Sequence, residues 1–164
     1  MKKVLVTYPD RCTGCRICEL RFAYHHTSEA NPARSRIKVL KWEDKGLNVP
    51  LTCHQCLKCT VIEPCPVKAI SRNPKTNAVV INRELCIGCR ICLFECPFGA
   101  PSIDPIGKVA VNCDLCNGYP KCVEWCPTQA IEYIPADKES LIRKRESLKT
   151  ASEYVKMVVG EEVS

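Results

Sequence analysis

The chain has 164 residues, of which 15 are cysteines and 6% are aromatic, and its formal net charge is +6. This length suits one compact domain or two small fused ones, and the few aromatic residues predict a thin core. An odd cysteine count without a visible secretory signal disfavours a disulfide scaffold, and no stretch is long enough for direct membrane insertion.

The N-terminal segment MKKVLVTYPDRC leads directly into the first cysteine burst, which consists of Cys12, Cys15 and Cys18. It contains neither an apolar export segment nor a twin-arginine pair, so we expect a cytoplasmic protein. The connection that follows, 19–52, is the longest cysteine-free stretch before the last burst. Imperfect alternation of apolar and polar residues predicts a strand from Arg36 to Trp42 within it.

The second burst and the segment after it predict a metal-binding loop followed by a hairpin. The burst contains Cys53, Cys56, Cys59 and Cys65. The segment AISRNPKTNAVVINREL then has a turn signal at 73–77 and an apolar strand at 79–81.

The third burst has the most specific pattern in the chain. Its cysteines follow the C-x2-C-x2-C-x3-C-P run of bacterial [4Fe–4S] ferredoxins, with Cys86, Cys89, Cys92 and Cys96. Three thiolates three residues apart let one loop surround a cluster, while the fourth cysteine of each run ligates a neighbouring cluster. Zinc sites instead use separated C-x2-C pairs, so zinc alone is a weaker interpretation. A second hairpin is expected to turn at 104–107 into a strand at 109–111.

The fourth burst completes an internal repeat. It contains Cys113, Cys116, Cys122 and Cys126, and the segments CPVKAI, CPFGAPSI and CPTQAI share Cys-Pro, alanine and isoleucine. We therefore predict an α+β fold of two bacterial-ferredoxin-like modules, one inserted in the other, with short hairpins and a C-terminal helix. The outer module would comprise 1–52 and 105–135, the inner module 53–104, and the helical tail 136–164.

The tail is rich in charged residues and strong helix formers. Asp137 is placed to cap a helix, and Leu141, Leu148, Ala151, Val155 and Val158 form an apolar stripe at helical spacing. The stripe is expected to pack on its own domain; the alternative is a contact with a partner subunit.

The positive charge does not predict nucleic-acid binding. An oxidised [4Fe–4S] cluster with four thiolates carries about −2, so three clusters would bring the net charge to about zero. No basic run is interleaved with aromatic residues in the manner of single-strand binding proteins.

The four-burst arrangement resembles the polyferredoxin-type electron-transfer subunits of molybdenum and tungsten oxidoreductases. The segments CTGCRICEL and NPARSRI are similar to small iron–sulfur subunits of tungsten enzymes of the aldehyde oxidoreductase type, including class II benzoyl-coenzyme A reductase. The resemblance implies a catalytic oxidoreductase subunit, carrying a tungsten or molybdenum pterin, and further redox subunits as partners.

The resemblance also implies how cysteines are shared among clusters. One [4Fe–4S] cluster would be held by Cys12, Cys15, Cys18 and Cys126, a second by Cys53, Cys56, Cys59 and Cys96, and a third by Cys86, Cys89, Cys92 and Cys65. The remaining Cys113, Cys116 and Cys122 would begin a fourth metal centre.

Two departures from the family pattern affect these sites. Phe22 stands where relatives have a fourth cysteine of the first burst, so the fourth centre lacks one thiolate. It is then a [3Fe–4S] cluster, a [4Fe–4S] cluster with another ligand, another metal or an empty site; His25 and His26 are nearby nitrogen donors, although structural histidines are commoner. In the second burst, Cys59 comes early and Val61 occupies the usual third position.

The expected function is electron transfer by a subunit that is not itself an enzyme. The alternative is an iron–sulfur enzyme that uses the incompletely ligated cluster as its substrate site. Asp114, Asn117 and Glu124 suit a solvated loop near that centre, and His54 is expected to be a surface histidine.

Overall fold

A computed structural model describes residues 3–159 of the chain. Its strands form four two-stranded antiparallel sheets: β1 (Lys3–Thr7) with β8 (Ile131–Pro135), β2 (Lys38–Trp42) with β3 (Leu47–Leu51), β4 (Ile70–Arg72) with β5 (Val79–Ile81), and β6 (Ser102–Ile103) with β7 (Ala110–Val111). The helices are α1 (Ile17–Thr27), α2 (Ile91–Glu95), α3 (Lys121–Glu124) and α4 (Lys138–Val159). This mixture of helices and small sheets agrees with the predicted α+β class.

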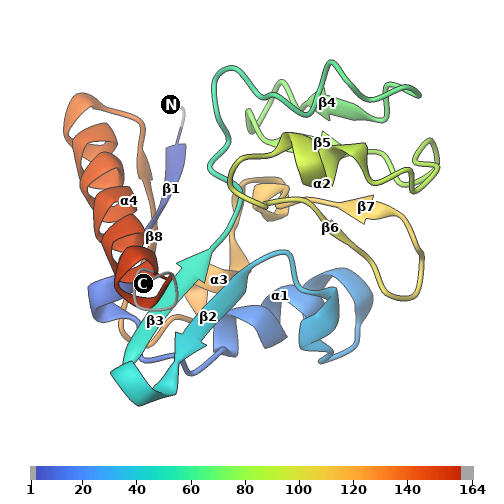
Figure 1. The fold of residues 1–164 in the computed structure, drawn as a ribbon. Coiled ribbons are helices and arrows are strands. Elements are labelled where there is room, and N and C mark those ends of the chain that lie inside the picture. Colours follow the sequence, from blue (N-terminus) through green and yellow to red (C-terminus); the bar gives the residue numbers. More distant parts are fainter. Residues whose placement is uncertain (1–2, 160–164) are drawn as a thin grey trace.

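The first and last strands of the described chain pair with each other. Lys3 lies opposite Pro135 and Thr7 opposite Ile131, so β1 and β8 form one continuous ladder. Figure 1 shows this pair beside α4, whereas β4, β5, α2, β6 and β7 lie on the other side of the molecule. Strands from the two ends of the described chain therefore lie side by side.

The predicted hairpins are present because polar side chains fix their turns. The Asn73 side-chain oxygen accepts hydrogen bonds from the backbone of Lys75 (2.9 Å) and Thr76 (3.3 Å). Asn77 then takes a left-handed conformation with φ +62°, which asparagine tolerates better than most residues. In the second hairpin Asp104 accepts a hydrogen bond from the Ile106 backbone at 3.2 Å, although its second strand begins at Ala110, one residue later than expected.

The expected strand at 36–42 is observed as β2, from Lys38 to Trp42. Val39 is buried, whereas Leu40 is 38% exposed, so the strand has one buried face. The buried Glu19 carboxylate of α1 accepts a hydrogen bond of 2.6 Å from the Val39 backbone. This bond joins β2 to α1, the helix that contains Cys18 of the first burst.

Two apolar clusters form the core. The larger one joins Leu5, Phe22, Val39 and Ile131 to the cysteines of the first and fourth bursts. The smaller one groups Val61, Ile70, Val79 and Ala110 around cysteines of the second and third bursts. Cysteine side chains are thus part of both cores, as the thin aromatic content suggested.

Asp104 forms a buried ion-pair cluster that joins distant segments. Only 3% of it is exposed, and its carboxylate receives two hydrogen bonds from the Arg34 guanidinium, at 3.0 and 3.1 Å. Arg83 forms a further ion pair with the same carboxylate. Burial raises the pKa of Asp104, but these arginines and a backbone hydrogen bond lower it more, to about 2.

The C-terminal helix packs on its own chain, as expected. Asp137 caps it, since the Asp137 side chain accepts a hydrogen bond of 2.8 Å from the Ser140 backbone. The helix contacts β1 and β3. The predicted stripe was wrong at Leu141, which is 52% exposed, because Ser140 and Ser147 are the residues that face inward in this part of the helix.

Among the helices of residues 3–159, none combines the length and the apolar character that a membrane crossing needs.

Candidate metal centres

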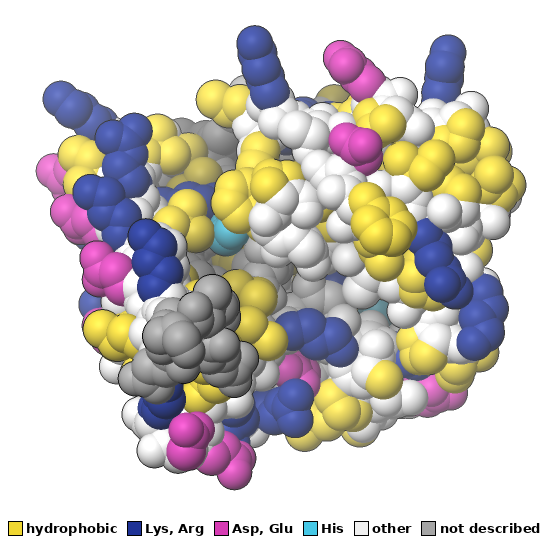
Figure 2. Space-filling model, viewed as in Figure 1, with side chains coloured by type: hydrophobic (Ala, Val, Ile, Leu, Met, Phe, Trp, Pro, Cys, Tyr) yellow, Lys and Arg dark blue, Asp and Glu magenta, His cyan; other side chains and the backbone are white. Residues whose placement is uncertain are grey.

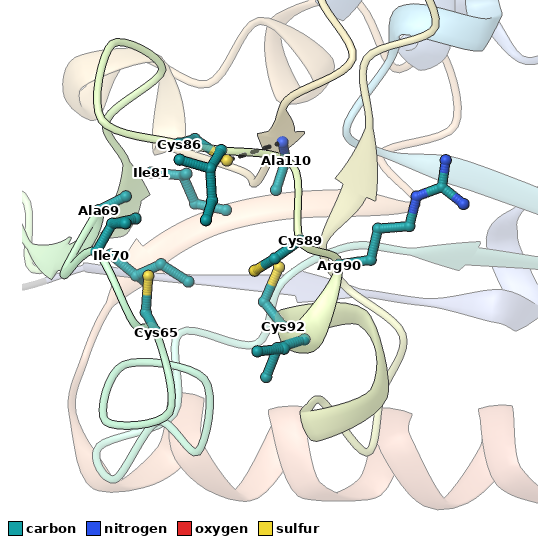
Figure 3. A pocket seen from close by; sticks show the side chains of 12 residues that line it. Cys65, Ala69, Ile70, Ile81, Cys86, Cys89, Arg90, Cys92 and Ala110 are labelled. Atoms are coloured by element: carbon teal, nitrogen blue, oxygen red, sulfur yellow. Dashed lines mark hydrogen bonds between the residues drawn. The ribbon is translucent and has the colours of Figure 1, made fainter.

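The third burst and one cysteine of the second burst surround a common cavity. Figure 3 shows Cys65, Cys86, Cys89 and Cys92 arranged around it, with Ile70, Ile81 and Ala110 completing the wall. Cys86, Cys89 and Cys92 come from one loop, while Cys65 precedes β4. Four sulfurs in an apolar surrounding suit a cluster that needs thiolate ligands and protection from water.

The loop of the third burst depends on left-handed backbone conformations. Gly88 has φ +70°, and a Cβ atom there would lie 2.6 Å from the Lys108 carbonyl oxygen. Arg90, also left-handed with φ +67°, precedes the first residue of α2. The Ala110 backbone N–H donates to Cys86 Sγ at 3.3 Å, a bond that orients the sulfur and stabilises negative charge on it.

The first burst repeats this construction with a cysteine from the far end of the chain. Cys12, Cys15, Cys18 and Cys126 line a second cavity. Here Gly14 has φ +69° and Arg16 has φ +59°. The Ala130 N–H donates to Cys126 Sγ at 3.2 Å. The two loops therefore share both sequence, C-x-G-C-R-I-C, and backbone shape.

The cysteines of the second burst are divided between the two apolar clusters, with Cys53 in the larger one and Cys59 and Cys65 beside the smaller one. Asn112 Nδ2 donates to Cys53 Sγ at 3.3 Å. Cys59 and Cys96 pack against the same apolar cluster. Burial raises the pKa of Cys56, and the nearby charges of Cys59 and Cys96 raise it further, which places these three thiols in one neighbourhood.

Val61, at the position where the family resemblance leads one to expect a cysteine, is 3% exposed and belongs to the inner core. Val61 therefore serves packing in this chain, and Cys59 packs against the same apolar cluster.

Burial makes several of these cysteines poor thiolates without a compensating cation. Burial raises the pKa of Cys18 to about 12 and the pKa values of Cys53, Cys92 and Cys113 to about 11. Neighbouring sulfurs raise these values further, because several negative charges in one small space repel each other. Binding of iron would remove the protons and supply the missing positive charge, so the residues fit iron–sulfur clusters.

The fourth burst differs from the other three because its cysteines are packed tightly. Cys113, Cys116 and Cys122 are between 2% and 5% exposed, and they lie in the larger core with Phe22. Leu115, Cys116 and Asn117 have φ values of +58°, +44° and +55°, and Gly118 follows with +99°. Consecutive left-handed residues are costly for non-glycine side chains and concentrate at functional sites.

Asp114 and His26 meet at this loop, which sequence reasoning missed. His26 Nε2 lies 3.4 Å from Asp114 Oδ1 and 3.7 Å from Cys116 Sγ. Because both contacts use the same ring nitrogen, the three residues do not form a nucleophile–base–acid relay. The expectation of a solvated Asp114 was wrong, since its carboxylate is half-buried and also pairs with Arg36 at 3.1 Å. One helix turn separates Phe22 from His26, and this spacing was the sequence feature from which a position of His26 near the fourth burst could have been predicted.

The spacing of ligand atoms argues against isolated tetrahedral zinc at the first three cysteine bursts, whereas Cys116 of the fourth burst belongs to a compact group. Zinc–sulfur bonds of about 2.3 Å place tetrahedral sulfurs about 3.8 Å apart. Within residues 3–159, the group of three ligating side chains whose ligand atoms lie within 4.8 Å of one another is His25, His26 and Cys116. The cysteine sets are spread more widely, as a multinuclear cluster requires.

His54 is half-buried beside the second burst, contrary to the expected surface position. Its ring meets the Phe98 ring edge-on at 4.6 Å between centroids, and burial lowers the pKa of His54 to about 4. Lys144 Nζ donates to the His54 carbonyl oxygen at 2.8 Å. The C-terminal helix thereby places a partly buried positive charge near Cys53 and Cys56.

These cysteine sets coincide with a known domain. The 4Fe–4S dicluster domain model matches residues 45–135, more than half of the chain. The chain belongs to this 4Fe–4S dicluster family. The match covers the second, third and fourth bursts, whereas the first burst lies outside it.

Two curated relatives are named as a subunit or a component of an oxidoreductase or a hydrogenase. The aliphatic sulfonate oxidoreductase polyferredoxin-like subunit of Pyrococcus furiosus is 47% identical over 108 residues, which cover 66% of this chain and 61% of that protein. Hydrogenase-4 component A of Escherichia coli K12 is 34% identical over 62% of this chain and 48% of its own length. The chain thus spans between half and three fifths of these relatives.

One solved structure is also similar along almost the whole length. The active site complex BamBC of benzoyl coenzyme A reductase, bound to benzoyl-CoA, contains a chain that is 23% identical with a TM-score of 0.47. The alignment covers 94% of this chain and 98% of that one.

Proposed function

We propose that this chain is an electron-transfer subunit of an oxidoreductase complex and holds three [4Fe–4S] clusters. The observation that carries the proposal is the pair of cavities, each lined by three cysteines of one burst and one cysteine of a distant burst. When bound, such clusters supply one-electron transfer at potentials between about −700 and +450 mV. In this proposal the chain itself is not an enzyme.

The two cavities and the neighbourhood of the second burst support the proposed ligand sets. In this proposal Cys12, Cys15, Cys18 and Cys126 hold one cluster, Cys86, Cys89, Cys92 and Cys65 another, and Cys53, Cys56, Cys59 and Cys96 the third. Cys65 and Cys96 each leave their own burst to serve the neighbouring one. The N–H donors of Ala110 and Ala130 and the amide of Asn112 orient three of the sulfurs.

The crossed ligands support a nested organisation. We propose an outer module made of 1–52 and 105–135, an inner module of 53–104, and a helical tail of 136–164. The β1–β8 pairing supports the outer module, because it joins the two ends of that division. The separate smaller core around Val61, Ile70 and Val79 supports the inner one.

We further propose a tungsten or molybdenum pterin enzyme as the catalytic partner, in the cytoplasm. The support is the sequence resemblance at CTGCRICEL and the Pyrococcus furiosus relative, which is named as a subunit of an aliphatic sulfonate oxidoreductase. Large exposed apolar side chains offer docking area: Leu57 is 92% exposed, Phe94 87% and Ile87 66%. Figure 2 shows hydrophobic side chains gathered in the upper right part of the molecule, on the side where β5 and α2 lie in Figure 1.

Metal analysis of the anaerobically purified protein tests the cluster proposal. Three cubane clusters correspond to about twelve iron and twelve sulfide ions per chain, and dithionite should bleach the brown colour. Fewer than about nine irons per chain, or a colourless zinc-loaded protein, would overturn it. Isolation of the native complex with tungsten or molybdenum measured in the same fractions tests the partner separately.

A further inference from the structure

We infer that His25, His26 and Cys116 together bind one zinc ion, separately from the iron–sulfur clusters. The inference goes beyond the proposed function, because it uses no cysteine of the three proposed [4Fe–4S] ligand sets. His26 and Cys116 are 90 residues apart in the chain. A shared ion would therefore fasten the last turn of α1 to the loop of the fourth burst.

The first argument is that the three ligand atoms are close enough for a single ion. One nitrogen of each histidine and Cys116 Sγ all lie within 4.8 Å of one another. With bonds of about 2.0–2.1 Å to nitrogen and about 2.3 Å to sulfur, a nitrogen and a sulfur on one tetrahedral zinc ion lie about 3.6 Å apart. His26 Nε2 and Cys116 Sγ are 3.7 Å apart, so this pair already has that spacing. Ligands of two different irons in a cluster would lie farther apart, because the irons themselves are separated.

The second argument is the carboxylate beside the same nitrogen. Asp114 Oδ1 lies 3.4 Å from His26 Nε2, which is longer than the usual nitrogen–oxygen hydrogen bond of about 2.7–3.2 Å. An oxygen and a nitrogen on one tetrahedral zinc ion lie about 3.4 Å apart. The carboxylate is held in place by the Cys116 N–H at 3.0 Å and by Arg36 at 3.1 Å. Asp114 is outside the compact group of three, so it completes the coordination after a small rotation of its carboxylate.

The third argument is that the two imidazoles are held in position before any ion binds. The His26 ring stacks on the Phe22 ring, with centroids 4.4 Å apart and 25° between the planes, and Phe22 is only 1% exposed. The His25 ring meets the His26 ring edge-on, with centroids 4.9 Å apart. Both histidines lie in the last turn of α1, where the partial negative charge of the helix end favours a cation.

The fourth argument is the change in exposure across the group. Cys116 is 5% exposed, the His26 side chain is 15% exposed, and His25 lies at the surface. The donors therefore lead from solvent into the core, so that an ion can enter while the sulfur stays shielded. Binding of the ion displaces the Cys116 proton, which passes to solvent.

The loop conformation singles out Cys116 among the three core cysteines of the fourth burst. Leu115, Cys116 and Asn117 are all left-handed, a conformation that is costly for non-glycine residues and concentrates at functional sites. Cys113 and Cys122 are 3% and 2% exposed and belong to the larger core. Buried free cysteines behave as small apolar residues, so these two need no metal.

The test uses the full-length protein, purified anaerobically with its iron, supplied with one equivalent of zinc and then separated from unbound metal. We expect about one zinc ion per chain in a protein that keeps its iron. X-ray absorption at the zinc edge, which iron does not obscure, should show one sulfur at about 2.3 Å and nitrogen or oxygen ligands at about 2.0–2.2 Å.

Variants locate the ion. His25→Ala, His26→Ala and Cys116→Ser should each weaken zinc affinity by at least about tenfold, measured by competition with a chelator. His54 is the remaining histidine of the three in the chain, and His54→Ala should bind zinc as the parent does.

Three results would reject the inference. They are a parent that retains no zinc, zinc surrounded by four sulfurs, which would place it in a cysteine burst, and zinc affinity unchanged in His25→Ala. His25 is exposed, so its replacement should not disturb folding, and His25→Ala decides if the other two variants lose their iron. Fewer than about nine irons per chain would reject the proposed function instead, and the zinc-edge spectrum would still judge the inference.

Discussion

The third-burst and fourth-burst sites are built from the same kind of cysteine loop but solve different problems. The loop of Cys86, Cys89 and Cys92 lines an apolar pocket together with Cys65 from another burst. The loop of Cys113, Cys116 and Cys122 is packed into the larger core with Phe22. The first loop turns at a left-handed glycine, Gly88, whereas the second turns at three left-handed residues that are not glycine. The wider spacing of the fourth burst, with five residues between Cys116 and Cys122, therefore accompanies a different loop.

Crossed ligation is the feature of the cavity sites whose loss should have the largest effect. Cys96→Ser should remove about four irons from the site of the second burst, although Cys96 belongs to the third. Spectroscopy that resolves the individual clusters, together with iron analysis, measures the loss. Cys15→Ser serves as a control, because it should affect the first-burst site instead. Selective loss of the cluster held by Cys86, Cys89 and Cys92 would show that the ligands are not crossed.

Phe22→Ala should damage the packed site. Removal of a fully buried phenylalanine typically destabilises a protein by about 3–5 kcal/mol, because the lost contacts leave a cavity. Phe22 is 1% exposed, whereas Phe94, the matched control, is 87% exposed and its removal should cost less than about 0.5 kcal/mol. Denaturant unfolding of both variants under anaerobic conditions gives the difference. Equal stabilities would mean that the ring is not part of the core.

Gly88→Ala should damage the cavity site by a smaller amount. The left-handed conformation at Gly88 costs a non-glycine residue about 1–2 kcal/mol, and the added Cβ also meets the Lys108 carbonyl oxygen at 2.6 Å. Gly99 is also left-handed, with φ +58°, but nothing lies within 4 Å of its Cβ position. Gly99→Ala should therefore incur only the conformational cost. Unfolding curves and the iron content of the two variants separate the clash from the conformation.

Phe22→Cys should give the fourth-burst site a fourth thiolate and so make it more like the cavity sites. A thiolate at this position should either convert an incomplete centre into a stable [4Fe–4S] cluster or add a new cluster, since it supplies the missing ligand. Iron analysis and redox titration of the variant and the parent measure both effects. Identical iron content and spectra would contradict the assignment of position 22 to the fourth centre.

Lys144→Met should have the smallest effect. Lys144 Nζ is held near Cys53 and Cys56 by its 2.8 Å hydrogen bond to the His54 carbonyl. Loss of this positive charge should lower the potential of the cluster at the second burst by on the order of 50 mV, equivalent to about 1 kcal/mol for one electron. Lys149→Met, on the exposed side of α4, should leave every potential unchanged. Redox titration followed by electron paramagnetic resonance decides.

The sequence predicted the cavity sites better than the packed one for a physical reason. A C-x2-C-x2-C run has to wrap a cluster locally, so its ligands, its hairpins and the Asp137 cap can be inferred from neighbouring residues. The Asp114–His26 contact, the position of Lys144 beside the second burst and the burial of His54 all depend on tertiary packing between distant segments. Leu141 was misplaced for a related reason, because polar serines took the inner face of α4.

The pairing of β1 with β8 has a consequence for biosynthesis. Strand β1 is made well before its partner at 131–135, so β1 waits roughly 6 to 25 seconds at usual translation rates of about 5–20 residues per second. During this time Cys12, Cys15 and Cys18 lack both their sheet and Cys126, and their thiols are open to oxidation. The β4–β5 and β6–β7 hairpins, which lie between the first burst and Cys126 in the sequence, form sooner. Newly made chains should therefore bind iron first at the sites of the second and third bursts, and oxygen exposure during synthesis should damage the first-burst site most.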